Sequence, residues 1–189
     1  DTAAVICGIG GGGLITGVGS AVKALNPQIK VWGAEPETAA PAALSFSLGS
    51  PQVFKEWKPS FVDGAGGQSV FPRMWERMKP IVDDYIVVSL DETKRAMRLM
   101  AEKARVISEG AGALPLAAAL TGKVGQGPIV AIVSGGNIDM NVIARVIEKG
   151  LVQEGRLVRL SLIVPDRPGA LARVSTLVAD QEANIREIE

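Results

Sequence analysis

The chain contains 189 residues, a length that suits one domain and part of another. Its 20 basic and 20 acidic side chains cancel, which argues against a general binder of nucleic acids or membrane surfaces. Because it has no histidine, Ser-His-Asp hydrolysis, His-ligated zinc and histidine acid–base catalysis are excluded within these residues. Cys7 is the only cysteine and can form no internal disulfide, so we expect a reducing compartment, the cytoplasm.

Four apolar runs predict buried strands, and amphipathic stretches predict the helices between and after them. The strands are expected near Ala3–Ile9, Lys30–Glu35, Asp83–Val88 and Pro128–Val133. The helices are expected over Leu14–Leu25, Ala39–Leu48, Ser69–Met78, Asp91–Ala104, Gly112–Thr121 and Asn137–Lys149. The strands are almost continuously apolar, as strands buried on both faces are. They therefore predict an α/β fold in three layers, a parallel sheet with helices on both faces.

The spacing of Ser89-Leu90-Asp91-Glu92 is that of a capping box, which predicts that a helix begins there. Further along, the composition changes near Gly150 and predicts a second module. We expect residues 1–150 to form the first domain, 151–155 a linker and 156–189 the second module.

The second module reads as a β-α-β piece. Arg156–Val164 alternates like a half-buried strand, a helix follows to about Asp180, and Ala183–Ile188 resembles the start of another strand. A piece of this size cannot bury a core alone. We therefore expect a partial α+β module that is cut off at Glu189 or completed by a partner chain.

The most informative segment is the four-glycine run Gly10–Gly13, which follows the first apolar strand and precedes a predicted helix. Glycine lets the backbone approach an anion closely, because no Cβ intervenes. Unpaired N–H groups at the helix start and the helix dipole both favour negative charge there. The pattern predicts a site for a phosphorylated small molecule. A tight turn without a ligand is the alternative, although four glycines weaken the flanking elements more than a plain turn requires.

Two cofactor classes fit this turn. The window Gly8–Gly13 satisfies the G-x-G-x-x-G pattern of dinucleotide-binding folds, and Glu35 closes the next strand near the position of their ribose-binding acid. On this window alone, an NAD-dependent dehydrogenase with a regulatory tail stays open. A third, non-enzymatic alternative is an amino-acid-sensing module that has retained the fold of a cofactor-binding enzyme.

Further segments favour a different cofactor. With the glycine run they are Gly10-Gly11-Gly12-Gly13-Leu14, Gly33-Ala34-Glu35-Pro36-Glu37, Asp63-Gly64, Glu109-Gly110-Ala111-Gly112-Ala113 and Ser134-Gly135-Gly136-Asn137. In this order and at this spacing they resemble the threonine dehydratase branch of the fold type II pyridoxal-phosphate enzymes, which includes serine racemase-like proteins. Asp166-Arg167-Pro168-Gly169-Ala170-Leu171 resembles the opening of an ACT regulatory domain.

The resemblance implies the fold type II large domain, the cofactor pyridoxal 5′-phosphate and a homo-oligomeric ammonia-lyase. The substrate would be a small amino acid, threonine or serine, and an amino-acid effector would bind the ACT module. The residues implied to contact the cofactor are Gly10, Gly11, Gly12, Gly13, Leu14, Gly64, Glu109 and Ser134.

The implied roles differ along that set. Main-chain N–H groups of the first five residues would hold the cofactor phosphate. Gly64 would let the backbone pass beside the ring, and Glu109 would lie near the ring or the substrate end. Ser134 would hydrogen-bond the pyridine nitrogen as a neutral partner, which should favour elimination at Cβ. The alternatives are a loop glycine at 64, a solvated helix-terminal carboxylate at 109, and a turn or helix-cap serine at 134, with Asn137 as another possible cap.

Three family features are missing from this sequence. No lysine lies in the Ser-x-Lys motif of the Schiff-base lysine, and the Asn-His-Gly type substrate loop is absent. A divalent-cation site that some relatives build around the glutamate at position 35 needs an acidic residue six positions on, where this chain has Pro41. We therefore expect no metal site and no nucleophile here. The lysines on predicted helices, which we expect to be solvated, are Lys23, Lys94, Lys103 and Lys149.

Overall fold

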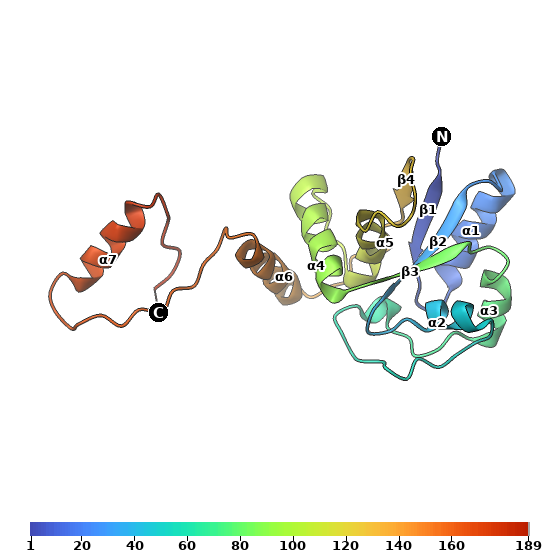
Figure 1. Cartoon of the computed structure of the whole chain (residues 1–189), viewed down its shortest axis with the longest axis horizontal. Helices are drawn as coiled ribbons and strands as arrows, with labels where there is room; N and C mark the ends of the chain where they lie inside the picture. Colours follow the sequence, from blue (N-terminus) through green and yellow to red (C-terminus); the bar gives the residue numbers. More distant parts are fainter. Residues whose placement is uncertain (189) are drawn as a thin grey trace. The chain divides into compact units, whose positions relative to one another are not determined.

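The computed structural model describes residues 1–188 and divides into two compact units, Asp1–Arg156 and Leu157–Glu189. The larger unit is built on a four-stranded sheet (Figure 1). Its strands are β1 (Ala4–Gly8), β2 (Lys30–Pro36), β3 (Asp84–Val88) and β4 (Ile129–Ala131). Their order is β3-β2-β1-β4, and every neighbouring pair is parallel. The predicted parallel sheet is confirmed, although β4 is shorter than the expected strand.

Helices cover both faces of this sheet, as the sequence predicts (Figure 1). One face carries α1 (Gly13–Leu25), α2 (Pro41–Leu48) and α3 (Pro72–Met78). The other face carries α5 (Gly110–Leu120), which touches all four strands, and α4 (Leu90–Leu99) and α6 (Met140–Gln153) pack beyond it. Two short elements lie in the connections, the 3₁₀ turn η1 (Asp63–Ala65) and the π-helical segment η2 (Met100–Ala104).

The hydrophobic core lies in two layers, one on each side of the sheet. Alternation along β1 divides its side chains between them, because successive residues of a strand point to opposite faces. Val5 and Cys7 face the α1–α3 layer, whereas Ala4 and Ile6 face the α5 layer. The central strands β1 and β2 are buried on both faces, which is why they read as continuous apolar runs, whereas the edge strands β3 and β4 expose Val87 and Val130.

Capping residues and prolines, rather than the apolar pattern, set the helix starts described next. The capping box is confirmed, because the Ser89 hydroxyl accepts the N–H of Glu92 and the Glu92 carboxylate accepts the N–H of Ser89. The helix expected from Ser69 begins only at α3, where Pro72 occupies the first turn and lacks the N–H that would otherwise stay unpaired there.

The helix expected over Asp91–Ala104 is one continuous helical region whose last turn widens into η2. It ends at Arg105, which takes a left-handed conformation with φ 60°. The last helix of the unit begins at Met140 and continues through Gln153, so residues 151–153 of the expected linker are helical.

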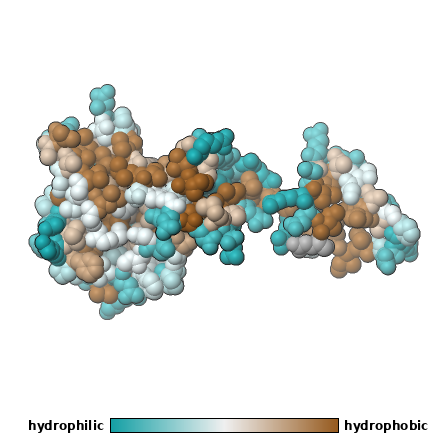
Figure 2. Space-filling model, turned by 180° about the vertical axis from the view of Figure 1, so that it is seen from behind, coloured by the Kyte–Doolittle hydropathy of each residue, from teal (hydrophilic) through white to brown (hydrophobic). Residues whose placement is uncertain are grey.

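The smaller unit contains one helix, α7 (Ala170–Ala179), within residues 157–188. The two strands expected at Arg156–Val164 and Ala183–Ile188 do not form in this described part of the chain, which is a correction. A strand needs a neighbour for its backbone groups, and the apolar alternation alone supplies none. No side chain in 157–188 is buried, and apolar surface is exposed on both units (Figure 2).

No helix within residues 1–188 is long and apolar enough to cross a bilayer.

Candidate functional site

The sheet has a switch point between β1 and β4. The chain leaves β1 toward α1 on one face, and it leaves β4 toward α6 on the opposite face. Connections that diverge from adjacent parallel strands open a crevice at the carboxyl edge of the sheet, where α/β proteins bind their ligands. The glycine run follows β1 and Ser134 follows β4, so both predicted segments lie at this edge.

The glycine run forms a turn whose backbone is partly packed and partly open. Gly12 caps α1 with φ 85° and no side-chain hydrogen bond, and a Cβ there would lie 2.7 Å from Met78 Sδ. A Cβ on Gly10 would lie 2.5 Å from the carbonyl oxygen of Gly64. By contrast, nothing lies within 4 Å of the Cβ positions of Gly11 and Gly13. The turn therefore packs inward at two residues and presents bare backbone outward at the other two.

The first N–H groups of α1 point out of the helix without intrahelical partners, as at every helix N-terminus. Thr16 is the first residue whose backbone N–H returns to the helix, donating to the carbonyl oxygen of Gly12 at 3.1 Å. Leu14, the second helical residue, is 40 % exposed. Donors, an open backbone and the positive end of the helix dipole thus coincide here, which suits an anionic group.

Gly64 and Glu109 lie next to this turn. Gly64 is in η1, with its carbonyl oxygen against Gly10, and a Cβ on Gly64 would lie 3.5 Å from Glu109 Oε1. Glu109 is half-buried at the N-cap position of α5, and its side chain makes no capping hydrogen bond. Its carboxylate lies beside Gly64 and Gly135, the latter in the segment after β4.

Ser134 lies in the loop between β4 and α6. It is exposed, and within residues 1–188 its hydroxyl forms no hydrogen bond with the protein. The helix-cap alternatives for Ser134 and Asn137 are wrong, because Asp139 caps α6 and its carboxylate accepts the N–H of Asn141 at 2.7 Å. The next residue, Gly135, accepts a hydrogen bond from the N–H of Glu109 at 3.1 Å. The structure thus brings together the glycine turn, Gly64, Glu109 and the Ser134 loop.

Glu35 is committed to a structural role that the sequence did not reveal. It is 1 % exposed, and its two carboxylate oxygens accept the N–H groups of Ala42 and Ala43 at 3.0 and 2.7 Å. It therefore caps α2 from the end of β2. The signal in the sequence is Pro41, which marks a helix start whose preceding residues offer no capping side chain.

Burial raises the pKa of the Glu35 carboxyl to about 7, and the two backbone hydrogen bonds offset only part of that effect. Burial also raises the pKa of the Cys7 thiol to about 11, so at neutral pH this cysteine is a protonated core residue. Neither group is presented to a ligand at the carboxyl edge of the sheet.

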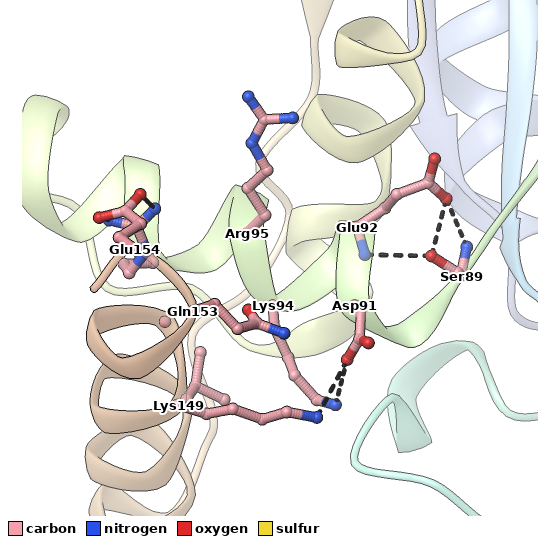
Figure 3. A pocket seen from close by; sticks show the side chains of 11 residues that line it. Ser89, Asp91, Glu92, Lys94, Arg95, Lys149, Gln153 and Glu154 are labelled. Atoms are coloured by element: carbon pink, nitrogen blue, oxygen red, sulfur yellow. Dashed lines mark hydrogen bonds and ion pairs between the residues drawn. The ribbon is translucent and has the colours of Figure 1, made fainter. Parts of the chain in front are cut away.

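A cavity of about 470 Å³ lies elsewhere in the larger unit, between α4 and α6 (Figure 3). Five of its charged side chains form ion pairs with one another. Lys94 and Lys149 both approach Asp91, at 2.8 and 3.3 Å, while Arg98 is held by Glu154. The ion pairs around this cavity join α4 to α6 and the segment after it. The cavity shares no residue with the predicted site.

The chain matches the family model described as "Pyridoxal-phosphate dependent enzyme" over residues 1–135, and the model described as "ACT domain" over residues 158–189. The first match covers most of the chain, which therefore belongs to the pyridoxal-phosphate dependent enzyme family. The α6 segment lies between the two matched regions.

Named relatives agree with this assignment. The L-threonine ammonia-lyase of Thermotoga maritima is 40% identical over 189 residues, which are 100% of this chain and 47% of the relative. A solved threonine deaminase from T.th. has a TM-score of 0.70 at 35% identity, covering 74% of this chain and 47% of that one. Maize serine racemase has a TM-score of 0.69 at 34% identity, covering 80% and 49%.

The chain spans about half the length of the curated relatives that it matches. The fold type II prediction is confirmed by these neighbours. The NAD-dependent dehydrogenase alternative is set aside, because the family match assigns the glycine turn to a pyridoxal-phosphate enzyme and Glu35 is buried under α2.

Proposed function

We propose that this chain forms the cofactor-holding part of a pyridoxal 5′-phosphate-dependent threonine ammonia-lyase, which deaminates L-threonine to 2-oxobutanoate and ammonia. L-Serine is the alternative substrate. The observation that carries the proposal is the meeting of the glycine turn, Gly64, Glu109 and the Ser134 loop at the carboxyl edge of the sheet. The names of the relatives support the reaction class.

The residues present fit the cofactor. Its phosphate is a dianion, and the turn offers main-chain donors at Gly11 and Gly13, where no other atom lies within 4 Å of the Cβ positions. The turn itself contains no carboxylate that would repel a phosphate. Side chains larger than hydrogen would collide at Gly10 and Gly12, so the packing of the turn accounts for these two glycines, and the proposed phosphate accounts for the open Gly11 and Gly13.

When bound, pyridoxal phosphate supplies an electron-withdrawing ring that stabilises negative charge developing at the substrate α-carbon. In this proposal the Gly10–Leu14 amides hold the phosphate and Gly64 borders the ring. The Ser134 hydroxyl is the neutral partner of the ring nitrogen. The Glu109 carboxylate lies beside Gly64 and Gly135 at the N-terminus of α5.

The proposal assigns no nucleophile to the described residues. Lys23 pairs with Asp83 at 2.6 Å, and Lys94 and Lys149 share Asp91. These lysines are engaged in ion pairs rather than simply solvated, and none of these pairs involves the glycine turn. We therefore expect the 189-residue chain to bind the cofactor without catalysing ammonia release from threonine.

The second unit is proposed to bind an amino-acid effector, because it matches the ACT domain model. We further propose residues 1–150 as the catalytic domain, 156–189 as the regulatory module, a homo-oligomeric assembly, and a cytoplasmic location. The single cysteine is compatible with a reducing compartment.

The test is calorimetric titration of the chain with pyridoxine 5′-phosphate, which carries the ring and phosphate but has no aldehyde to react with surface lysines. Pyridoxine, inorganic phosphate and NAD are the comparison ligands. Saturable binding of pyridoxine 5′-phosphate, with much weaker binding of pyridoxine, is the expected result. Saturable NAD binding without pyridoxine 5′-phosphate binding would overturn the proposal.

Gly11→Asp is the sharpest variant for this test. The position is open, so the side chain fits without distorting the turn, but its charge would repel the phosphate. We expect binding of pyridoxine 5′-phosphate to be lost while the far-ultraviolet circular dichroism spectrum stays unchanged. Gly11→Asn, of the same size and without the charge, is the matched control and should retain measurable affinity. Unchanged affinity in Gly11→Asp would refute the phosphate site.

A further inference from the structure

Ser134 takes its position from the backbone of its loop rather than from its own contacts. Its hydroxyl forms no hydrogen bond within residues 1–188, and the residue is exposed after a short edge strand. Because the Ser134 hydroxyl is the proposed partner of the ring nitrogen, other residues must fix the position of its loop. The segment 107–112, which leads into α5, provides three contacts to the residues that follow Ser134.

The first contact is the hydrogen bond from the N–H of Glu109 to the carbonyl oxygen of Gly135, at 3.1 Å. The second lies one helical turn further on. A Cβ on Gly112 would lie 2.6 Å from that same carbonyl oxygen and 3.1 Å from the backbone nitrogen of Gly135. Only hydrogen fits between α5 and the loop at this point, because real Cβ atoms keep a longer distance from backbone oxygen.

The third contact joins Gly136 and Ile107. A Cβ on Gly136 would lie 2.9 Å from the carbonyl oxygen of Ile107. A Cβ on Gly135 would overlap Glu109 Oε1. The two backbones therefore interlock, with glycine at every position where a side chain would hold them apart.

The α5 side of the contact at Gly112 is rigid. The buried residues of α5, among them Ala113, Leu114 and Ala117, fix the helix on the sheet. The second neighbour of a Cβ at Gly112 is the hydroxyl oxygen of Ser108, at 2.6 Å, and Ser108 is 1 % exposed. The clash of an added methyl group would thus be relieved mainly by a shift of the loop, because the helix and Ser108 have no room to move.

We propose that Gly112 is a positioning residue that sets the place of Ser134 for the cofactor ring. This inference rests on the proposed function and deepens it. The phosphate end of the cofactor is held by the β1–α1 turn, whereas the ring-nitrogen end depends on how closely the loop docks on α5. Gly112 serves that docking, although a glycine inside a helix costs about 1 kcal/mol relative to alanine, whereas a Cβ on the neighbouring Gly110 would meet Phe61 and Val62 instead.

Two ligands test the two ends of the cofactor site separately, because inorganic phosphate occupies only the phosphate end and pyridoxine 5′-phosphate occupies both. Gly112→Ala should weaken pyridoxine 5′-phosphate binding at least tenfold and leave the affinity for inorganic phosphate within twofold of the wild type. The ultraviolet absorption of bound pyridoxine 5′-phosphate, which reports the protonation of the ring nitrogen, should change as it does in Ser134→Ala. Gly17→Ala is the matched control, because it adds the same methyl group to a helical glycine with open space around it.

A double-mutant cycle decides whether Gly112 acts through Ser134. In the Ser134→Ala background, Gly112→Ala should cost less than twofold in affinity. An equal loss in both backgrounds, or a parallel loss of inorganic phosphate binding, would overturn the inference while the proposed function stands. Failure of the wild type to bind pyridoxine 5′-phosphate would overturn both. If Gly112→Ala does not fold, Gly136→Ala is measured in its place and should behave in the same way.

Discussion

The buried carboxyl of Glu35 makes a prediction whose size follows from the structure. Its pKa lies at about 7 in the folded chain, against an ordinary value of 4.5, because burial disfavours the charged form. The folded state therefore binds this proton more tightly than the unfolded state. The resulting stability is fully present below pH 4.5, declines as the pH rises, and is lost above about pH 7.

The two pKa values correspond to about 3 kcal/mol in total, and about 2 kcal/mol of it should be lost between pH 5 and pH 8. Glu35→Gln removes the titrating group. Between pH 5 and pH 8 the unfolding free energy of the variant should therefore fall by about 2 kcal/mol less than that of the wild type. At pH 5 the variant should be the less stable protein, because an amide cannot accept both N–H groups that the carboxyl group faces.

Urea unfolding at pH 5, 6, 7 and 8, followed by tryptophan fluorescence, measures this difference. All three tryptophans, Trp32, Trp57 and Trp75, lie in the larger unit, so the signal reports the unit that contains Glu35. Glu76→Gln is the control, because Glu76 is an exposed glutamate on α3 and its variant should keep the wild-type pH dependence. A pH-independent difference between wild type and Glu35→Gln would refute the reasoning.

Two further predictions concern helix starts. Gly12→Ala should destabilise the larger unit by about 1–3 kcal/mol, because φ is 85° there and a Cβ would press on Met78. Gly17→Ala should stabilise the unit by about 0.5–1 kcal/mol in the same urea experiment, because it replaces a helical glycine that has open space around it. Equal effects of the two substitutions would contradict this account of the turn. Ser89→Ala should lower the unfolding free energy by about 1 kcal/mol through loss of the bond to the Glu92 N–H, and a change below about 0.3 kcal/mol would show that the cap contributes little.

The sequence by itself determined the elements whose signals are local. Continuous apolar runs specify the parallel strands, of which β1 and β2 are buried on both faces, and the capping box at Ser89 specifies the start of α4, because both signals depend on residues a few positions apart. The glycine run likewise identified the turn after β1. These patterns are sufficient for the parallel sheet and for most of the helices around it.

Only the tertiary structure decided where distant segments meet. Glu35 caps α2 across a chain reversal, and Asp139, rather than Asn137 or Ser134, caps α6. Strands did not form in residues 157–188, because alternation specifies a face but not a neighbouring strand to bond with. The docking of Gly112 against Gly135 depends on a distance of ångströms between residues far apart in sequence, and no periodicity of side chains encodes such a distance.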